Sequence, residues 1–131
     1  MNTKAKGTKG ERDLIKLFWT AGFAAIRVAG SGSSHFPCPD LLAGKANRHL
    51  AIECKVTKEN SKYFTRDEIN ELDFFCKTYG AEGFVAVKFP KTDWAFFILE
   101  DLKETKAANF SIALKDIATK GLSFEQLCGF F

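Results

Sequence analysis

Apolar positions recur along the chain with two different periods, which predicts a mixed α/β protein. Between residues 9 and 22 they follow helical spacing, with Leu14 and Phe18 on the apolar stripe and Gly22 as the stop. Apolar runs of strand length occur at 23–30, 40–45, 49–56, 84–89 and 94–99. The Gly-, Ser- and Pro-containing segment 31–37 is predicted to be a loop.

A second helix is predicted to start after Thr65. Thr65 and Glu68 have the spacing of a capping box, and apolar residues follow at helical spacing up to Gly80. Ser123 is predicted to cap a short C-terminal helix. The resulting order, helix–β–β–β–helix–β–β, predicts an α/β fold with a mixed sheet of about five strands flanked by helices.

The composition suits one domain spanning residues 1–131. Of the 131 residues, 46% are hydrophobic and 27% are charged, which is typical of a globular protein rather than a disordered one. No apolar run approaches the length needed to cross a bilayer, and the polar N-terminus lacks the apolar core of a secretory signal. We therefore expect a soluble, cytoplasmic protein without membrane partners, in which the four cysteines are reduced.

The net charge of +3 is mild, but its distribution is uneven. Lys4, Lys6 and Lys9 all precede the first acidic residue. We interpret residues 1–8 as a flexible basic arm that contacts a polyanion such as DNA. The alternative is a solvated tail without a partner.

Three charged residues interrupt the apolar runs at 40–45 and 49–56. Strand alternation places Glu53 and Lys55 on one face of the second run and Cys54 on the other. Asp40 opens the adjacent strand and can reach the same place. In the first helix, Glu11 precedes Leu14 by three positions and is predicted to face inward beside the apolar stripe.

Two carboxylates and an ammonium at one place have two interpretations. One is a structural ion pair. The other is a Mg²⁺ site, because this hard cation takes carboxylate oxygens, water and substrate phosphate. There Asp40 and Glu53 would hold the ion, and Lys55 would position water and stabilise the transition state of phosphodiester hydrolysis.

The residues "PD" at 39–40 and "ECK" at 53–55 match the P-D-x(n)-(D/E)-x-K motif of restriction-endonuclease-like nucleases. Over most of its length the chain also resembles the archaeal Holliday junction resolvases of the Hjc type. The resemblance is carried by "KGTKGERDLIKLFWTAGFAAIRVAGSGS", "PDLLAG", "AIECK" and "YFTRDEINELDFF". It implies a structure-selective endonuclease that resolves four-way DNA junctions by paired, symmetric, Mg²⁺-dependent nicks in recombination and repair, with Mn²⁺ as a substitute and no small-molecule cofactor.

The resemblance also implies roles for individual residues. Those that correspond to catalytic positions are Glu11, Ser31, Asp40, Glu53 and Lys55, of which Glu11, Asp40 and Glu53 are the implied metal ligands. Ser33 and Ser34 lie beside Ser31, so which loop serine acts, if any, is open. The implied DNA contacts are Lys4, Lys6, Lys9, Arg12, Arg27 and Arg66. Where relatives carry a glutamine after the motif, this chain has "TRDEIN", and we predict helix capping for Glu68.

The resemblance further implies a homodimer, which would present two identical sites to a two-fold symmetric junction. The 14 phenylalanines agree with this, because "LCGFF" at 127–131 ends in two adjacent phenylalanines that are hard to bury in a small monomer. A core that uses phenylalanine in place of leucine is the alternative. Two other functions stay open, a general or sequence-specific nuclease of this fold and a non-catalytic module that binds nucleic acid.

Overall fold

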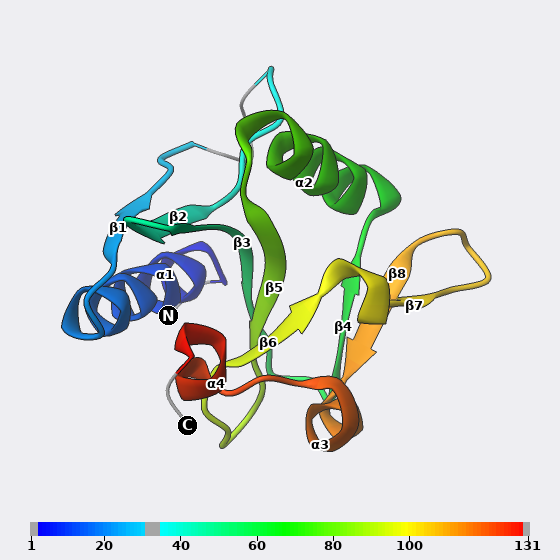
Figure 1. The fold of residues 1–131 in the computed structure, drawn as a ribbon. Helices are drawn as coiled ribbons and strands as arrows, with labels where there is room; N and C mark the ends of the chain where they lie inside the picture. Colours follow the sequence, from blue (N-terminus) through cyan, green and yellow to red (C-terminus); the bar gives the residue numbers. More distant parts are fainter. Residues whose placement is uncertain (1–2, 31–34, 130–131) are drawn as a thin grey trace.

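A five-stranded mixed sheet forms the centre of the structure, a computed structural model that describes residues 3–30 and 35–129 (Figure 1). The strand order is β1-β2-β3-β5-β6, in which β3 and β5 are parallel and every other pair is antiparallel. The strands are β1 (Ala24–Arg27), β2 (Leu41–Lys45), β3 (Arg48–Val56), β5 (Glu82–Lys88) and β6 (Ala95–Ile98). The predicted mixed sheet of about five strands is therefore confirmed.

The helices agree with the predicted ones, except that the first helix starts earlier than predicted. Helix α1 (Thr3–Thr20) begins six residues before the predicted position, so the stretch expected to be a flexible arm continues the helix. Helix α2 (Arg66–Tyr79) has the predicted capping box of Thr65 and Glu68. Helix α4 (Phe124–Cys128) is capped by Ser123, also as predicted. Among the described residues, no helix combines the length and apolar character that crossing a bilayer requires.

A second, three-stranded sheet was not predicted. Its order is β4-β8-β7, and all its pairs are antiparallel. These strands, and the short helices beside them, are β4 (Ser61–Phe64), β7 (Lys103–Glu104), β8 (Phe110–Ala113), η2 (Leu99–Asp101), η3 (Leu114–Asp116) and α3 (Ile117–Lys120). Strands of two to four residues with polar positions lack the sustained alternation on which a sequence-based assignment depends.

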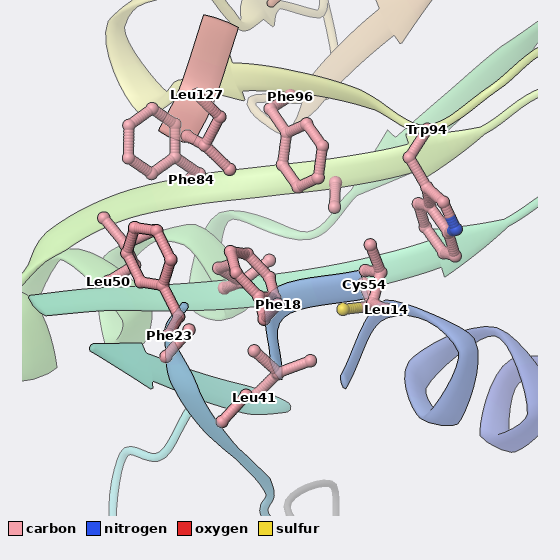
Figure 2. Packing of buried hydrophobic residues seen from close by; sticks show 14 of the residues in the cluster. Leu14, Phe18, Phe23, Leu41, Leu50, Cys54, Phe84, Trp94, Phe96 and Leu127 are labelled. Carbon is pink, nitrogen blue, oxygen red and sulfur yellow. The ribbon is translucent and has the colours of Figure 1, made fainter. Parts of the chain in front are cut away.

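Two apolar cores cover the two faces of the main sheet. The first lies under α1 and α4 and contains Leu14, Phe18, Leu50 and Phe96 (Figure 2). The second lies under α2 and the small sheet, and its buried residues include Ala51, Phe64, Ile69, Leu72, Val85, Phe97 and Ile112. Strand β3 alternates between them, so its odd-numbered residues face α2. This confirms the predicted alternation of the segment 49–56.

Phenylalanine fills much of both cores. Among the described residues, the buried phenylalanines are Phe18, Phe23, Phe64, Phe84, Phe89, Phe96 and Phe97. Leu127 and Cys128 at the start of "LCGFF" are also buried, whereas the expectation for the two adjacent phenylalanines that end it is not tested. Phe130 and Phe131 lie outside the described residues. The buried phenylalanines thus have an explanation within one chain and do not by themselves require a second copy.

Gly10 brings α1 close to the end of β3, and its substitution tests whether that contact matters. A Cβ at Gly10 would lie 2.8 Å from Cγ2 of Val56 and 3.2 Å from the ring of Trp94. We expect Gly10→Ala to lower stability by about 1–2 kcal/mol in thermal unfolding, because overpacking outweighs the better helix propensity of alanine.

Gly7 is the matched control, because a Cβ there meets nothing within 4 Å. We expect Gly7→Ala to stabilise the protein by up to about 1 kcal/mol through helix propensity alone. An equal gain for both variants would show that α1 does not pack closely at Gly10.

Candidate active site

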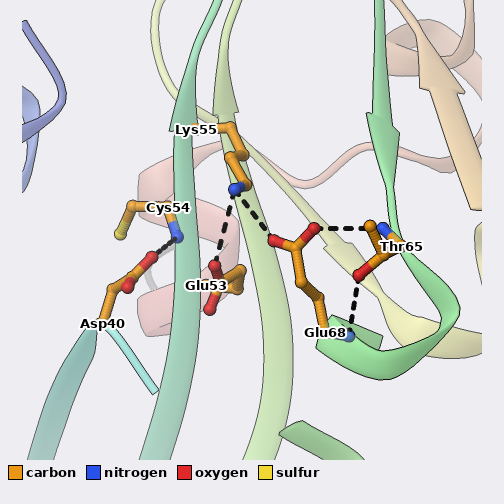
Figure 3. Close-up of polar contacts among 6 residues, drawn as sticks. All are labelled: Asp40, Glu53, Cys54, Lys55, Thr65 and Glu68. Atoms are coloured by element: carbon orange, nitrogen blue, oxygen red, sulfur yellow. Dashed lines mark hydrogen bonds and ion pairs between the residues drawn. The ribbon is translucent and has the colours of Figure 1, made fainter. Parts of the chain in front are cut away.

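The parallel strand β3 supplies the centre of the site. Glu53 and Lys55 are two residues apart in β3 and therefore project from the same face, toward α2 (Figure 3). The Lys55 Nζ lies 3.7 Å from Oε1 of Glu53. Only 14% of the Glu53 side chain is exposed, so its carboxyl group is largely removed from water.

Asp40 joins these residues from the start of β2. The β2–β3 ladder ends at the pair Leu41 and Ile52, and the Asp40 carboxylate then accepts a hydrogen bond from a backbone N–H further along β3. Its Oδ2 accepts a hydrogen bond of 2.9 Å from the Cys54 backbone N–H (Figure 3). Backbone hydrogen bonds to Val28 and Ile52 hold Asp40 between β1 and β3. The structure thus brings together Asp40, Glu53 and Lys55, as the sequence predicted.

Glu11 approaches the same group from α1. Its Oε1 accepts a hydrogen bond of 3.0 Å from Nε of Arg27, and 16% of the Glu11 side chain is exposed. Burial and the charge of Asp40 raise the pKa of Glu11, while Arg27 and Lys55 oppose the rise. Glu11 therefore faces inward as predicted and lies within the electrostatic field of the site.

Burial and a neighbouring carboxylate dominate the electrostatics of Glu53. Burial, followed by the nearby charge of Asp40, raises the pKa of Glu53 to about 9. Burial lowers the pKa of Lys55, but the hydrogen bond and charge of Glu68, with the charges of Glu53 and Asp40, raise it above the usual value overall. The ammonium is thus kept protonated beside carboxyl groups that repel one another.

Glu68 is the part of the site that the sequence assigned to helix capping alone. It does cap α2, because its carboxylate accepts a hydrogen bond of 3.0 Å from the Thr65 backbone N–H. Its other oxygen, Oε2, lies 2.9 Å from the Lys55 Nζ (Figure 3). The capping box predicted the place of Glu68 in α2, but nothing local predicted which strand that end of the helix faces.

The donor set suits a hard divalent cation held by few protein ligands. Within residues 3–30 and 35–129, no group of three His, Cys, Asp or Glu side chains is close enough to hold a metal ion unaided. Asp40 acts on the Glu53 carboxyl group through its charge and a side-chain hydrogen bond, so the two lie next to each other. Mg²⁺ commonly uses one or two carboxylates and fills its other positions with water and phosphate. The pair therefore fits such an ion, whereas direct ligation by Glu11 stays a prediction.

The residues predicted to contact DNA have different surroundings. Arg12 is exposed, and Lys9 is exposed and pairs with Asp13 at 3.1 Å. Arg27 pairs with Glu11, whereas Arg66 pairs with Glu104 and lies 5.0 Å over the ring of Phe110.

Three of the predicted residues are beyond what the structure describes. Lys4 and Lys6 are in α1, but their side chains lie outside the described part of the chain. Ser31 lies outside it altogether, as do Ser33 and Ser34.

Comparisons with known proteins point to one family. A family model described as archaeal Holliday junction resolvase (Hjc) matches residues 2–131. The chain is 47% identical over 128 residues to crossover junction endodeoxyribonuclease Hjc of Archaeoglobus fulgidus, covering 98% of this chain and 93% of the relative. It is 34% identical over 107 residues to the Hjc of Methanocaldococcus jannaschii, covering 82% and 75%.

A solved structure agrees with the sequence comparisons. The crystal structure of Hjc from Archaeoglobus fulgidus, a Holliday junction resolvase, superposes on this one with a TM-score of 0.86 and 45% sequence identity. The match covers 92% of this chain and 97% of that chain.

Proposed function

Because the chain belongs to the archaeal Holliday junction resolvase (Hjc) family, we propose that it cuts four-way DNA junctions at the site formed by Asp40, Glu53 and Lys55. Family membership confirms the predicted resemblance, the restriction-endonuclease-like fold and the class of enzyme, an endodeoxyribonuclease. The observation that supports this site most directly is the meeting of an aspartate, a glutamate and a lysine from neighbouring strands at one place beside β3.

Asp40 and Glu53 would hold a divalent metal ion, which we propose to be Mg²⁺ with Mn²⁺ as a substitute. Such an ion lowers the pKa of a bound water and stabilises charge on the phosphate. Glu11 is close enough to add to the negative field that attracts the ion. The hydrogen bond from Arg27 orients the Glu11 carboxylate. Lys55 would place a positive charge beside the phosphate that is cut, where negative charge develops in the transition state.

The nicks would be paired because two copies of the chain act together. A junction is two-fold symmetric, so a homodimer presents one identical site to each of two strands of like polarity. Large exposed apolar side chains, among them Phe74, Tyr79 and Ile26, support a second copy as their partner. The products would keep 5′-phosphate ends that a ligase can join.

DNA would be held mainly through its phosphates and its shape. Arg12 and Lys9 offer exposed positive charge on α1, the helix that carries Glu11. Lys58 and Lys88 lie in a hollow at the carboxyl ends of β3 and β5, the edge of the sheet next to Lys55. Contacts of this kind fix position and give little sequence preference, because phosphates carry no base identity.

A cleavage assay with matched substrates tests this function. The purified protein is incubated with Mg²⁺ and either a mobile four-way junction or a linear duplex of the same sequence. We expect the junction to be cut faster by roughly 10²-fold or more, in line with the usual gap between specific and non-specific DNA binding. Binding should weaken steeply as salt rises, because each phosphate contact releases counterions.

The same assay separates the alternatives. A general nuclease of this fold would cut the duplex and the junction equally. A non-catalytic binding module would retain the junction without cutting it. In either case the proposed resolvase activity would be wrong, whereas EDTA should stop the cutting if the activity is the metal-dependent one proposed here.

A further inference from the structure

Lys55 has two carboxylate neighbours, and the nearer one comes from a different element. Its Nζ lies 2.9 Å from Oε2 of Glu68 on α2 but 3.7 Å from Oε1 of Glu53 on its own strand. The ammonium ends a flexible four-carbon stem, so its position depends on which partner holds it. The contact with Glu68 therefore determines where the charge of Lys55 lies relative to Glu53 (Figure 3).

Glu68 itself is held in place by the start of α2. One carboxylate oxygen accepts a hydrogen bond from the Thr65 backbone N–H, and the Thr65 hydroxyl accepts one of 3.1 Å from the Glu68 N–H. The second carboxylate oxygen remains for Lys55. Because Ile69 and Leu72 are buried against the sheet, the helix start cannot move away freely. The Glu68 carboxylate that contacts Lys55 is therefore held in a fixed position by the capping box.

We propose that Glu68 is a positioning residue of the nuclease site, which holds the Lys55 ammonium on the α2 side of Glu53 and leaves the Glu53 carboxylate for the metal ion. This inference rests on the proposed function. Without Glu68, Glu53 would be the nearest carboxyl group to the ammonium, and the contact that now spans 3.7 Å would close to a direct hydrogen bond. Lys55 and the metal ion would then compete for the same Glu53 oxygens.

Glu68→Gln tests the proposal, because glutamine also completes a capping box but carries no charge. Single-turnover cleavage of a four-way junction is measured with excess enzyme over a range of Mg²⁺ concentrations. We expect the rate at saturating Mg²⁺ to fall about 10–100-fold, the usual effect of removing a partner that orients a group at a metal site. The Mg²⁺ concentration for half-maximal rate should rise, whereas junction affinity should stay within about twofold and Tm should be nearly unchanged.

Two matched controls separate positioning from general effects of charge and capping. Glu82→Gln makes the same charge change and breaks a comparable pair, in which Arg48 lies 2.8 Å from Glu82 at the opposite end of the β3–β5 pair. Gln126→Ala removes the equivalent capping oxygen from α4, which accepts a hydrogen bond of 2.9 Å from the Ser123 backbone N–H. We expect both variants to cut the junction at the wild-type rate when assayed below their Tm.

Each result supports or overturns the inference. Loss of rate in Glu68→Gln with Tm retained, and the same loss in Glu68→Ala with a lower Tm, supports positioning. Wild-type cutting by Glu68→Gln would show that Glu68 is a capping residue only, and so would a rate loss confined to Glu68→Ala. If the wild-type protein itself fails to cut the junction, the proposed function is wrong, which the wild-type arm of the assay shows separately.

Discussion

Asp40→Asn should abolish junction cutting and leave junction binding intact. The structure makes this substitution unusually specific, because the Asp40 Oδ2 accepts a hydrogen bond from the Cys54 N–H at 2.9 Å. An asparagine side chain has the same shape and keeps a carbonyl oxygen that can accept this bond. The hydrogen bond that joins Asp40 to β3 should therefore be kept, and only the negative charge that holds the cation is lost.

We expect the single-turnover cleavage rate to fall by at least about 10³-fold, at the upper end of the losses seen when electrostatic stabilisation of a transition state is removed. Junction affinity, measured by fluorescence anisotropy, should be unchanged or slightly higher, since the variant removes a negative charge that repels phosphate.

Asp116→Asn is the matched control for Asp40→Asn, because the Asp116 Oδ2 accepts a backbone N–H bond from Ala113 at the same distance, 2.9 Å, beside the second sheet. The control should cut at the wild-type rate. Near wild-type turnover by Asp40→Asn would remove Asp40 from the metal site. Loss of both binding and cutting would indicate that Asp40 serves the fold rather than the chemistry.

Glu53→Gln should make the protein more stable and inactive. The pKa of Glu53 is about 9 in the folded protein against an ordinary value of 4.5. The folded chain thus binds more protons than the unfolded chain between these pH values, so its stability falls as pH rises. The stabilisation from a neutral Glu53 is fully present below about pH 4.5 and is lost progressively as pH rises toward about 9.

A glutamine at position 53 stays neutral at every pH, so the variant does not lose stability as the pH rises toward about 9. In EDTA at about pH 7, we expect Glu53→Gln to be more stable than the wild type by about 2–3 kcal/mol, or roughly 5–10 °C in Tm. At about pH 4 the two proteins should unfold alike. Adding Mg²⁺ should raise the Tm of the wild type and leave that of the variant unchanged, because only a protein that binds the ion gains stability from it.

The control for Glu53→Gln is Glu82→Gln, which loses an ion pair with Arg48 and should be no more stable than the wild type at about pH 7. A Glu53 variant that is less stable than the wild type in EDTA would contradict the buried, repelled carboxyl group described here. A variant that gains stability yet still cuts the junction would show that Glu53 is not a metal ligand. The expected pattern, stability gained and activity lost, is common when a strained functional group is replaced.

The sequence determined the elements whose physical cause is local. The alternation in "LAIECKV" placed Glu53 and Lys55 on one face, because side chains of a strand alternate wherever the strand lies. The spacing of Thr65 and Glu68 predicted the start of α2, since a capping box uses only neighbouring residues. The nuclease motif and the family resemblance followed from the same local residues.

Elements with weak local signals were missed. The early start of α1 was not predicted because glycines at 7 and 10 have poor helix propensity. The second sheet was missed because its strands are stabilised by pairing with each other rather than by their own sequence pattern. Ser61–Phe64 pairs with residues 46 to 52 positions further along the chain. Tertiary contacts override local preference at such positions.

The tertiary structure alone decided how the site is completed. Glu68 meets Lys55 because α2 packs across the face of β3 that carries the motif, and Arg27 meets Glu11 because α1 lies against β1. Both contacts join residues that are thirteen or sixteen positions apart, and neither position shows a pattern that names its partner. Side-chain periodicity determines which face of its own helix or strand a residue lies on. Only the packing of one element on another determines which side chain that residue contacts.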